Sequence, residues 1–282
     1  MNESAMTPAG IPDRLVRDDA GIWTAPSRPA LSYPDDGHAE CFLLEDRSFW
    51  FAHRNRCILA AVRRHAPAGP ILDIGGGNGC VTRALIDAGF PAVLLEPGPT
   101  GAFNAKTHRR IPDVICAALG DAGFPAGSIA AAGLFDVLEH IEDDRGFLEE
   151  IHGKLKPGGL LYITVPAFGA LWSASDRRAG HFRRYSPRQL AERLSERYEL
   201  VFSTLFFGVL APPIWALRAL PWRLGFGRGG SLPAARREHG LDGGFRVRCL
   251  NRLLRREARR IETGRPVRWG ASCLCVARKP SS

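Results

Sequence analysis

The chain has 282 residues, of which 45% are hydrophobic and 24% charged, enough for one globular domain with an elaborate cap. A net charge of +9 favours anionic partners, but it comes almost entirely from arginine, and we do not expect nucleic acid to be the partner. The seven cysteines form no CxxC pair and no signal peptide is recognisable, so we expect a cytoplasmic protein, with membrane association as an alternative.

The first part of the chain divides into two segments. Residues 1–44 are rich in Pro, Gly, Asp and Ser without periodicity, which predicts a flexible N-terminal arm. Residues 45–69 carry apolar positions at helical spacing and begin with the aromatic run Phe49–Phe51, which predicts a lid helix.

Residues 70–166 alternate between strand and helix patterns. Strands are expected at 71–74, 92–96, 113–117, 129–135 and 160–165, with helices at 79–88 and 145–155. Such alternation is typical of an α/β fold, in which a parallel sheet has helices on both faces. We expect this half to bind a cofactor.

Residues 167–265 are expected to form a cap over the acceptor site, before a closing strand at 271–277. Ser186 and Pro187 predict the start of a helix. The uncharged run 200–217 contains Pro212 and Pro213, so we interpret it as strand, loop and helix rather than a membrane span. The arginine-rich helix at 245–261 is predicted either to be solvated or to rest on anionic lipid.

The glycine-rich stretch ILDIGGGNG, residues 71–79, predicts a ligand loop. A phosphate-binding P-loop requires Gly-Lys-Ser/Thr at its end, and this stretch ends in Asn78-Gly79-Cys80. The dinucleotide fingerprint fits poorly because Cys80 takes the place of a small residue.

The pattern D-x-G-x-G-x-G at 73–79 resembles that of class I S-adenosylmethionine-dependent methyltransferases. FDVLEHI at 135–141 and LKPGGLLYITVP at 155–166 resemble later motifs of the same superfamily. The resemblance implies a Rossmann-like seven-stranded sheet of order 3-2-1-4-5-7-6, with the last strand antiparallel. It also implies S-adenosylmethionine as cofactor and S-adenosylhomocysteine as product.

The resemblance also implies which residues hold the cofactor. Glycines let the backbone approach the methionine part, Asp73 holds the loop or faces the ammonium group, and Glu96 accepts the ribose hydroxyls. Relatives place an adenine-binding acid where this chain has Ala118, so Asp121 or the backbone near Leu119 is expected to replace it. The full predicted cofactor set is Asp73, Gly75, Gly76, Gly77, Gly79, Glu96, Pro97, Leu119, Asp121, Phe135 and Asp136.

Two stretches are candidates for the chemistry. Residues like Asp136, Glu139 and His140 bind a divalent metal in ubiquinone-pathway O-methyltransferases, but the first acid here is Asp, and we favour a metal-free pocket. SDRRAGHFRRYS at 175–186 contains a GHxRRY pattern that resembles a subset associated with lipid-linked or glycan-modifying pathways. The predicted catalytic residues are His181, Asp176, His140 and Tyr185, and the predicted acceptor contacts are Trp50, Arg183 and Arg184.

In that set, His181 is a candidate general base and the arginine pair a candidate grip for phosphate or carboxylate. The alternative is a solvated loop whose Tyr and Arg side chains fasten the cap to the sheet. We predict methyl transfer to an oxygen or nitrogen of a small-molecule or lipid-like acceptor, with peripheral membrane contact as a further expectation. A methyltransferase acting on RNA or protein, or a silent cofactor-binding relative, are the alternatives, and the oligomeric state is not predicted.

Overall fold

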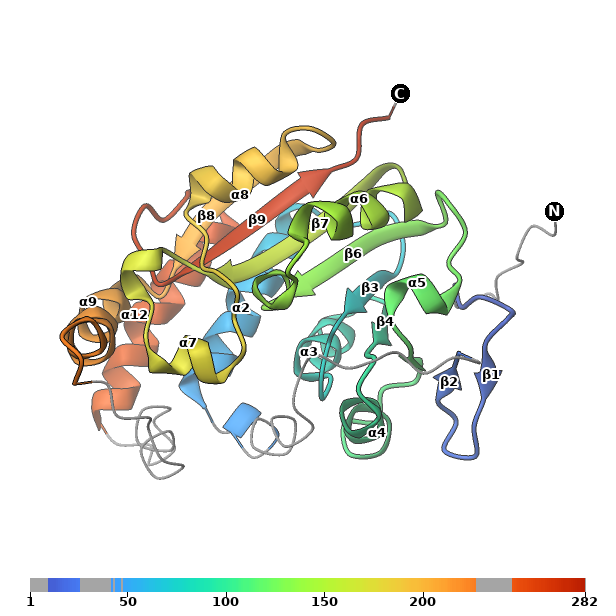
Figure 1. Ribbon diagram of the computed structural model, residues 1–282, viewed down its shortest axis with the longest axis horizontal. Helices are drawn as coiled ribbons and strands as arrows, with labels where there is room; N and C mark the ends of the chain where they lie inside the picture. The colour runs from blue at the N-terminus through green and yellow to red at the C-terminus, as the bar shows by residue number, and fades with distance from the viewer. Residues whose placement is uncertain (1–9, 26–41, 43, 47, 227–244, 282) are drawn as a thin grey trace.

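The computed structural model describes residues 10–25, 42, 44–46, 48–226 and 245–281 (Figure 1). A mixed sheet forms the centre, and the described part of the chain contributes nine strands in the order β1-β2-β5-β4-β3-β6-β7-β9-β8. The strands are β1 (Val16–Arg17), β2 (Trp23–Thr24), β3 (Ile71–Ile74), β4 (Ala92–Leu95), β5 (Val114–Cys116), β6 (Ile129–Phe135), β7 (Leu155–Pro166), β8 (Glu199–Phe206) and β9 (Ser272–Arg278).

The sheet corrects the seven-stranded prediction. A hairpin of β1 and β2 adds two strands at the β5 edge, where Trp23 pairs with Ile115. Within residues 10–25, Val16–Arg17 and Trp23–Thr24 thus belong to the sheet, which the sequence patterns did not predict. Without β1 and β2, and with β3 numbered as the first strand, the remaining seven strands have the expected order 3-2-1-4-5-7-6. Strand β9 runs antiparallel to both β7 and β8.

The helices agree with the predicted alternation up to residue 166. They are α2 (Phe49–Arg64), α3 (Cys80–Asp87), α4 (Pro99–Thr107), α5 (Leu119–Ala122) and α6 (Asp144–Lys154). The strand β7 begins earlier than predicted, at Leu155, because Leu155 already pairs with Ile129 of β6 before the glycines of KPGG.

The second half adds several short helices and one long helix to the sheet. It contains α7 (Ala174–Arg178), α8 (Pro187–Leu194), α9 (Ala211–Ile214), a π-helical turn η4 (Trp215–Ala219), α10 (Leu220–Arg223) and α12 (Phe245–Glu262). Ser186 caps α8 by accepting a hydrogen bond from the Gln189 backbone, as predicted. The run 200–217 forms strand and then helix, and no helix in the described residues is both long and apolar enough to cross a membrane.

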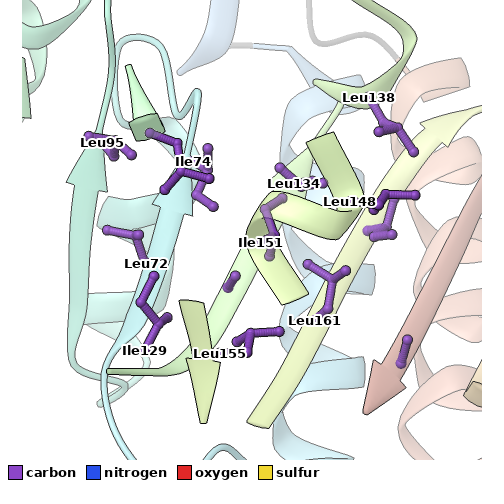
Figure 2. Packing of buried hydrophobic residues seen from close by; sticks show 14 of the residues in the cluster. Leu72, Ile74, Leu95, Ile129, Leu134, Leu138, Leu148, Ile151, Leu155 and Leu161 are labelled. Atoms are coloured by element: carbon purple, nitrogen blue, oxygen red, sulfur yellow. The ribbon is translucent and has the colours of Figure 1, made fainter. Parts of the chain in front are cut away.

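Hydrophobic side chains cover both faces of the sheet. Because alternate residues of a strand point to opposite sides, Leu72 and Ile74 of β3 pack in one cluster and Ile71 in another. Figure 2 shows the first cluster, in which Leu148 and Ile151 of α6 lie against the sheet. Helices α2, α3 and α12 cover the second face, which leaves the carboxyl ends of β3, β4 and β6 as the open edge.

Candidate functional site

A cavity of about 500 Å³ lies at the carboxyl ends of β3, β4 and β6. Ligands of open α/β sheets bind at this edge, where the loops after the strands meet. One side of the cavity is lined by the predicted cofactor residues Asp73, Gly75, Gly76, Gly77, Glu96, Pro97, Phe135 and Asp136. The other side is lined by residues of α2, α7 and the α9–η4 segment.

The glycine loop brings bare backbone to the cavity. Gly75 and Gly77 have φ of +68° and +55°, a region that favours glycine. A Cβ on Gly76 would lie 2.4 Å from Cδ1 of Leu94 and 2.9 Å from Oδ2 of Asp73. The loop therefore needs glycine for backbone conformation at two positions and for space at the third.

Asp73 is fully buried beneath the loop. Thr82 Oγ1 donates to its Oδ2 at 2.5 Å, while Oδ1 has no hydrogen-bond partner among the described residues. Burial raises the pKa of Asp73 to about 6, against the opposing effects of the Thr82 hydrogen bond and the Arg54 charge.

Glu96 is oriented by the backbone on both sides. Its Oε2 accepts the N–H of Gly77 at 2.8 Å, and its Oε1 accepts that of Gly98 at 2.7 Å. Burial raises the pKa of Glu96 to about 7, although these two hydrogen bonds favour the ionised form. The carboxylate is thus fixed in place at the cavity wall.

These residues fit S-adenosylmethionine. The ligand carries ammonium, sulfonium and ribose hydroxyl groups. The glycine loop offers backbone to it, Asp73 has a carboxylate oxygen without a hydrogen-bond partner among the described residues, and Glu96 has an oriented carboxylate. Asp73 and Glu96 are the acids that would face it.

Three predicted cofactor residues lie outside the cavity lining. Gly79 packs behind the loop, where a Cβ would lie 2.3 Å from Cδ1 of Ile111. Leu119 is buried in the core beside the sheet, and the backbone oxygen of Asp121 accepts a hydrogen bond from Arg14. This contact ties Asp121 to the segment just before β1, and Asp121 does not line the cavity.

Asp136 connects the two sides of the cavity. It has φ of +61° at the end of β6, and its Oδ2 accepts a hydrogen bond from Arg54 Nη1 at 2.8 Å. Burial lowers the pKa of Arg54, but the hydrogen-bonded Asp136 together with Cys80 and Glu45 raises it, and the net shift is upward. Helix α2 is therefore tied to the cavity floor by an ion pair.

Glu139, His140 and His181 form a cluster. Each offers one ligand atom, and these atoms lie within 4.8 Å of one another. Burial and the Asp136 charge raise the pKa of Glu139 well above its usual range, and burial and His181 lower that of His140 to about 4. The donor types suit a metal such as zinc, but burial disfavours the ionised carboxylate that would bind it, so the absence of a metal stays our prediction.

Asp176 organises the GHxRRY loop. Its Oδ1 lies 3.0 Å from Nδ1 of His181, and Arg184 donates to both carboxylate oxygens at 2.7 and 3.0 Å. Burial would raise the pKa of Asp176, but His181 and Arg184 lower it to about 2. The three side chains line the cavity together, as a fixed carboxylate with two partners.

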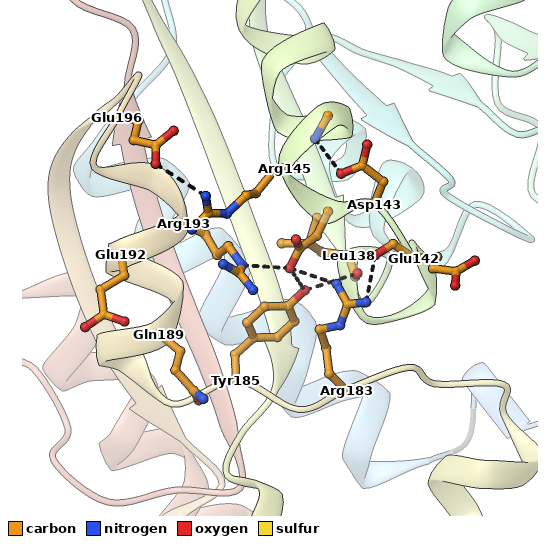
Figure 3. A network of polar contacts seen from close by, with 12 residues as sticks. Leu138, Glu142, Asp143, Arg145, Arg183, Tyr185, Gln189, Glu192, Arg193 and Glu196 are labelled. Atoms are coloured by element: carbon orange, nitrogen blue, oxygen red, sulfur yellow. Dashed lines mark hydrogen bonds and ion pairs between the residues drawn. The ribbon is translucent and has the colours of Figure 1, made fainter.

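Arg183 and Tyr185 lie outside the cavity lining, so the structure does not bring them together with Asp176, His181 and Arg184 at the cavity. The Tyr185 hydroxyl donates to Oδ2 of Asp144 at 2.8 Å, and Arg183 pairs with the same oxygen at 2.9 Å (Figure 3). Arg193 of α8 donates to it as well, at 3.1 Å. In an extended segment neighbouring side chains point to opposite sides, so only Arg184 reaches the cavity.

An aromatic wall completes the site. Trp50 stacks on Phe207 with ring centroids 3.8 Å apart, and both line the cavity. Phe207 has φ of +62°, and Glu257 of α12 accepts its backbone N–H at 2.8 Å. Because Glu257 also lies 2.6 Å from His53 of α2, it links the wall to both helices.

Sequence reasoning missed Arg54 and Glu257. Arg54 and Asp136 are 82 residues apart, and no local pattern connects them. Phe207 belongs to the apolar segment 206–222, which together with the aromatic run 49–51 was a candidate for the pocket wall.

A family model described as a methyltransferase domain matches residues 45–201. An uncharacterized methyltransferase of Mycolicibacterium gilvum (strain PYR-GCK) is 28% identical in a region covering 45% of this chain and 50% of that protein. A ubiquinone biosynthesis O-methyltransferase of Methylobacterium sp. (strain 4-46) is 29% identical over 38% of this chain and 48% of its own length. The chain thus spans about half the length of these curated relatives.

Solved structures agree on the fold. A chain from the complex between the Haloferax volcanii Trm112 methyltransferase activator and the putative methyltransferase aligns with a TM-score of 0.55 at 19% identity, over 87% of this chain and 95% of that chain. A possible histamine N-methyltransferase of Thermotoga maritima aligns with a TM-score of 0.51 at 17% identity, over 88% and 100%.

Proposed function

The chain belongs to the methyltransferase domain family, and we propose that it transfers a methyl group from S-adenosylmethionine to an oxygen or nitrogen of a small-molecule or lipid-like acceptor. One observation carries the proposal: a single cavity joins the glycine loop and Glu96 to the Asp176–His181 pair. The first group is suited to the donor, and the second to the acceptor.

S-adenosylmethionine, when bound, supplies an activated methyl group for in-line displacement. The protein then has to align the acceptor, exclude water and remove a proton. Ionised Asp176 favours the His181 tautomer with its proton on Nδ1, so that Nε2 accepts the proton of the acceptor. Arg184 neutralises Asp176 and holds it in place, which makes Arg184 a positioning residue rather than a grip for the acceptor.

The chemical nature of the wall supports the acceptor class. Trp50 and Phe207 offer an apolar surface beside the His181 side of the cavity, which suits an acceptor with an apolar portion. The relatives named for ubiquinone biosynthesis point in the same direction.

Isothermal calorimetry with S-adenosylhomocysteine tests the donor site. We expect the wild type to bind and Gly77→Arg to lose binding, because the side chain would occupy the loop. Gly153→Arg is the matched control, since a Cβ there meets nothing within 4 Å. Absence of binding by the wild type, or binding unchanged in Gly77→Arg, would contradict the proposal.

A screen of hydroxyl and amine acceptors tests the reaction. Formation of S-adenosylhomocysteine in the presence of an acceptor should depend on His181 and not on the exposed Arg177 of α7. If the protein binds the cofactor but His181→Ala turns over at the wild-type rate, His181 is not the base.

A further inference from the structure

The helical segment from Ala211 to Phe226 presents large apolar side chains to solvent. Leu217 and Phe226 are 76% and 75% exposed, Leu224 is 61% exposed and Trp215 is 44% exposed. Burial of Ala211 and Ala219 holds the opposite face of the segment against the protein. Single exposed apolar residues are ordinary, but four within one short segment require an explanation.

The charge around this segment has one sign. No Asp or Glu occurs between residues 200 and 226, whereas Arg218 and Arg223 lie within the segment. Helix α12 packs in the same hydrophobic cluster as Ala211 through Leu254 and Ala258. Its exposed face carries the arginines Arg252, Arg255, Arg256, Arg259 and Arg260.

The acids of α12 do not cancel this charge. Glu257 points inward, where its oxygens accept the N–H groups of Phe207 and Gly208. Glu262 lies at the end of the helix, 3.7 Å from Arg63 of α2. The outward charge of α12 is therefore positive, and α12 shares a hydrophobic cluster with Ala211 and Ile214 of the segment.

We propose that this surface, formed by residues 211–226 with the arginines of α12, docks on an anionic lipid bilayer. Tryptophan and arginine suit the interface between headgroups and acyl chains, and the transfer of leucine and phenylalanine side chains from water into this interface is favourable. Anionic headgroups complement the arginines, whose attraction adds to that of the apolar side chains.

The docking surface adjoins the cavity. Ile214 and Arg218 line the cavity, while Trp215 and Leu217, their neighbours in η4, point to solvent. A protein docked in this way holds the cavity beside the bilayer, so that an acceptor embedded in the membrane reaches the site without crossing water. This second step rests on the proposed function, whereas the docking itself does not.

Flotation of the full chain with lipid vesicles tests the docking. We expect binding to vesicles of phosphatidylcholine with phosphatidylglycerol, weaker binding to phosphatidylcholine alone, and partial release by high salt. Leu217→Ser/Phe226→Ser should weaken binding by about tenfold or more, because both side chains lose their burial in the bilayer. Val16→Ser is the matched control, since Val16 is 63% exposed on β1 at the other end of the sheet.

Calorimetry with S-adenosylhomocysteine shows whether the double variant remains folded, and its result separates the two proposals. Vesicle binding by a protein that does not bind the cofactor would support docking and overturn the proposed function. Equal binding to both vesicle types, or an equal effect of Val16→Ser, would overturn the docking. Light scattering could instead show that the wild type is a dimer, that the double variant is a monomer, and that neither binds vesicles. This result would assign the surface to a second copy of this chain and would overturn the docking proposal.

Discussion

Nδ1 of His181 lies 3.0 Å from Oδ1 of Asp176, and both side chains line the cavity that contains the glycine loop. The contact fixes the orientation of the imidazole in the absence of any acceptor.

Asp176→Asn and His181→Ala should lower kcat by about 100-fold or more, because each removes the oriented base. The Kd for S-adenosylhomocysteine should stay near its wild-type value, since neither residue belongs to the glycine-loop side. Single-turnover kinetics and calorimetry separate the two effects, with Arg177→Ala as the control on the same helix. If the affinity for S-adenosylhomocysteine fell as much as kcat, the two residues would instead be needed for the structure of the pocket.

Cofactor affinity should increase with pH through the region around pH 7. Burial raises the pKa of Glu96 to about 7, and only the ionised carboxylate accepts both ribose hydroxyls. Binding therefore releases a proton from Glu96, and Kd should rise by about tenfold for each pH unit below that value. Calorimetry between pH 6 and pH 8 measures the slope.

Glu96→Gln is the control for that slope, because its side chain does not titrate. Asp73, whose pKa is raised to about 6, still titrates in that variant. The part of the pH dependence of Kd that is lost in Glu96→Gln is therefore due to Glu96. A Kd that is the same at pH 6 and pH 8 in the wild type would show that the carboxylate is ionised throughout.

Gly76→Ala should destabilise the protein by about 1–3 kcal/mol and weaken cofactor binding. The added Cβ would lie 2.4 Å from Leu94 Cδ1, so either the loop or Leu94 has to move. Gly153→Ala in α6 meets nothing within 4 Å and should be neutral or slightly stabilising. Urea unfolding measures both, and equal midpoints would show that the loop has more room than the contacts indicate.

Tyr185→Phe should lower the free energy of unfolding by about 1 kcal/mol while kcat stays unchanged. The hydroxyl is buried and donates to Asp144, outside the cavity, and Arg183 and Arg193 remain as partners of that carboxylate. Thermal unfolding and steady-state kinetics on the same preparation test this. A kcat reduced in proportion to that of His181→Ala would return Tyr185 to the catalytic set.

Dialysis against EDTA should leave activity unchanged. Glu139 stands beside two histidines, but burial raises the pKa of its carboxyl and so disfavours the ionised form that binds a metal. Metal analysis before dialysis, and kcat before and after it, provide the measurement. Loss of activity that one equivalent of a divalent cation restores would establish a metal site at Glu139, His140 and His181.

Local patterns were sufficient for most of the sheet and for the donor side of the cavity. The strand at 71–74, the glycine loop and Glu96 follow from apolar runs and turn residues that lie close together in sequence, and the structure brings them to one edge. The β1–β2 hairpin was not predictable because each strand has only two residues and gains its order from β5.

The side of the cavity that contains Asp176 and His181 could not be predicted from local sequence patterns. Whether Arg183 or Arg184 faces the cavity is set by the extended segment that pairs Tyr185 with Ala167. Likewise, the partner of Asp136 comes from a helix far away in the chain, and only the folded sheet brings Arg54 to it.

The two faces of the 183–185 segment have separate tasks. Arg184 holds Asp176 at the cavity, while its two neighbours attach the loop to Asp144 and thereby to α6 and the sheet. A substitution on one face therefore need not disturb the other. The loop is thus a place where acceptor range can be redesigned, because its anchor is independent of the chemistry that it presents.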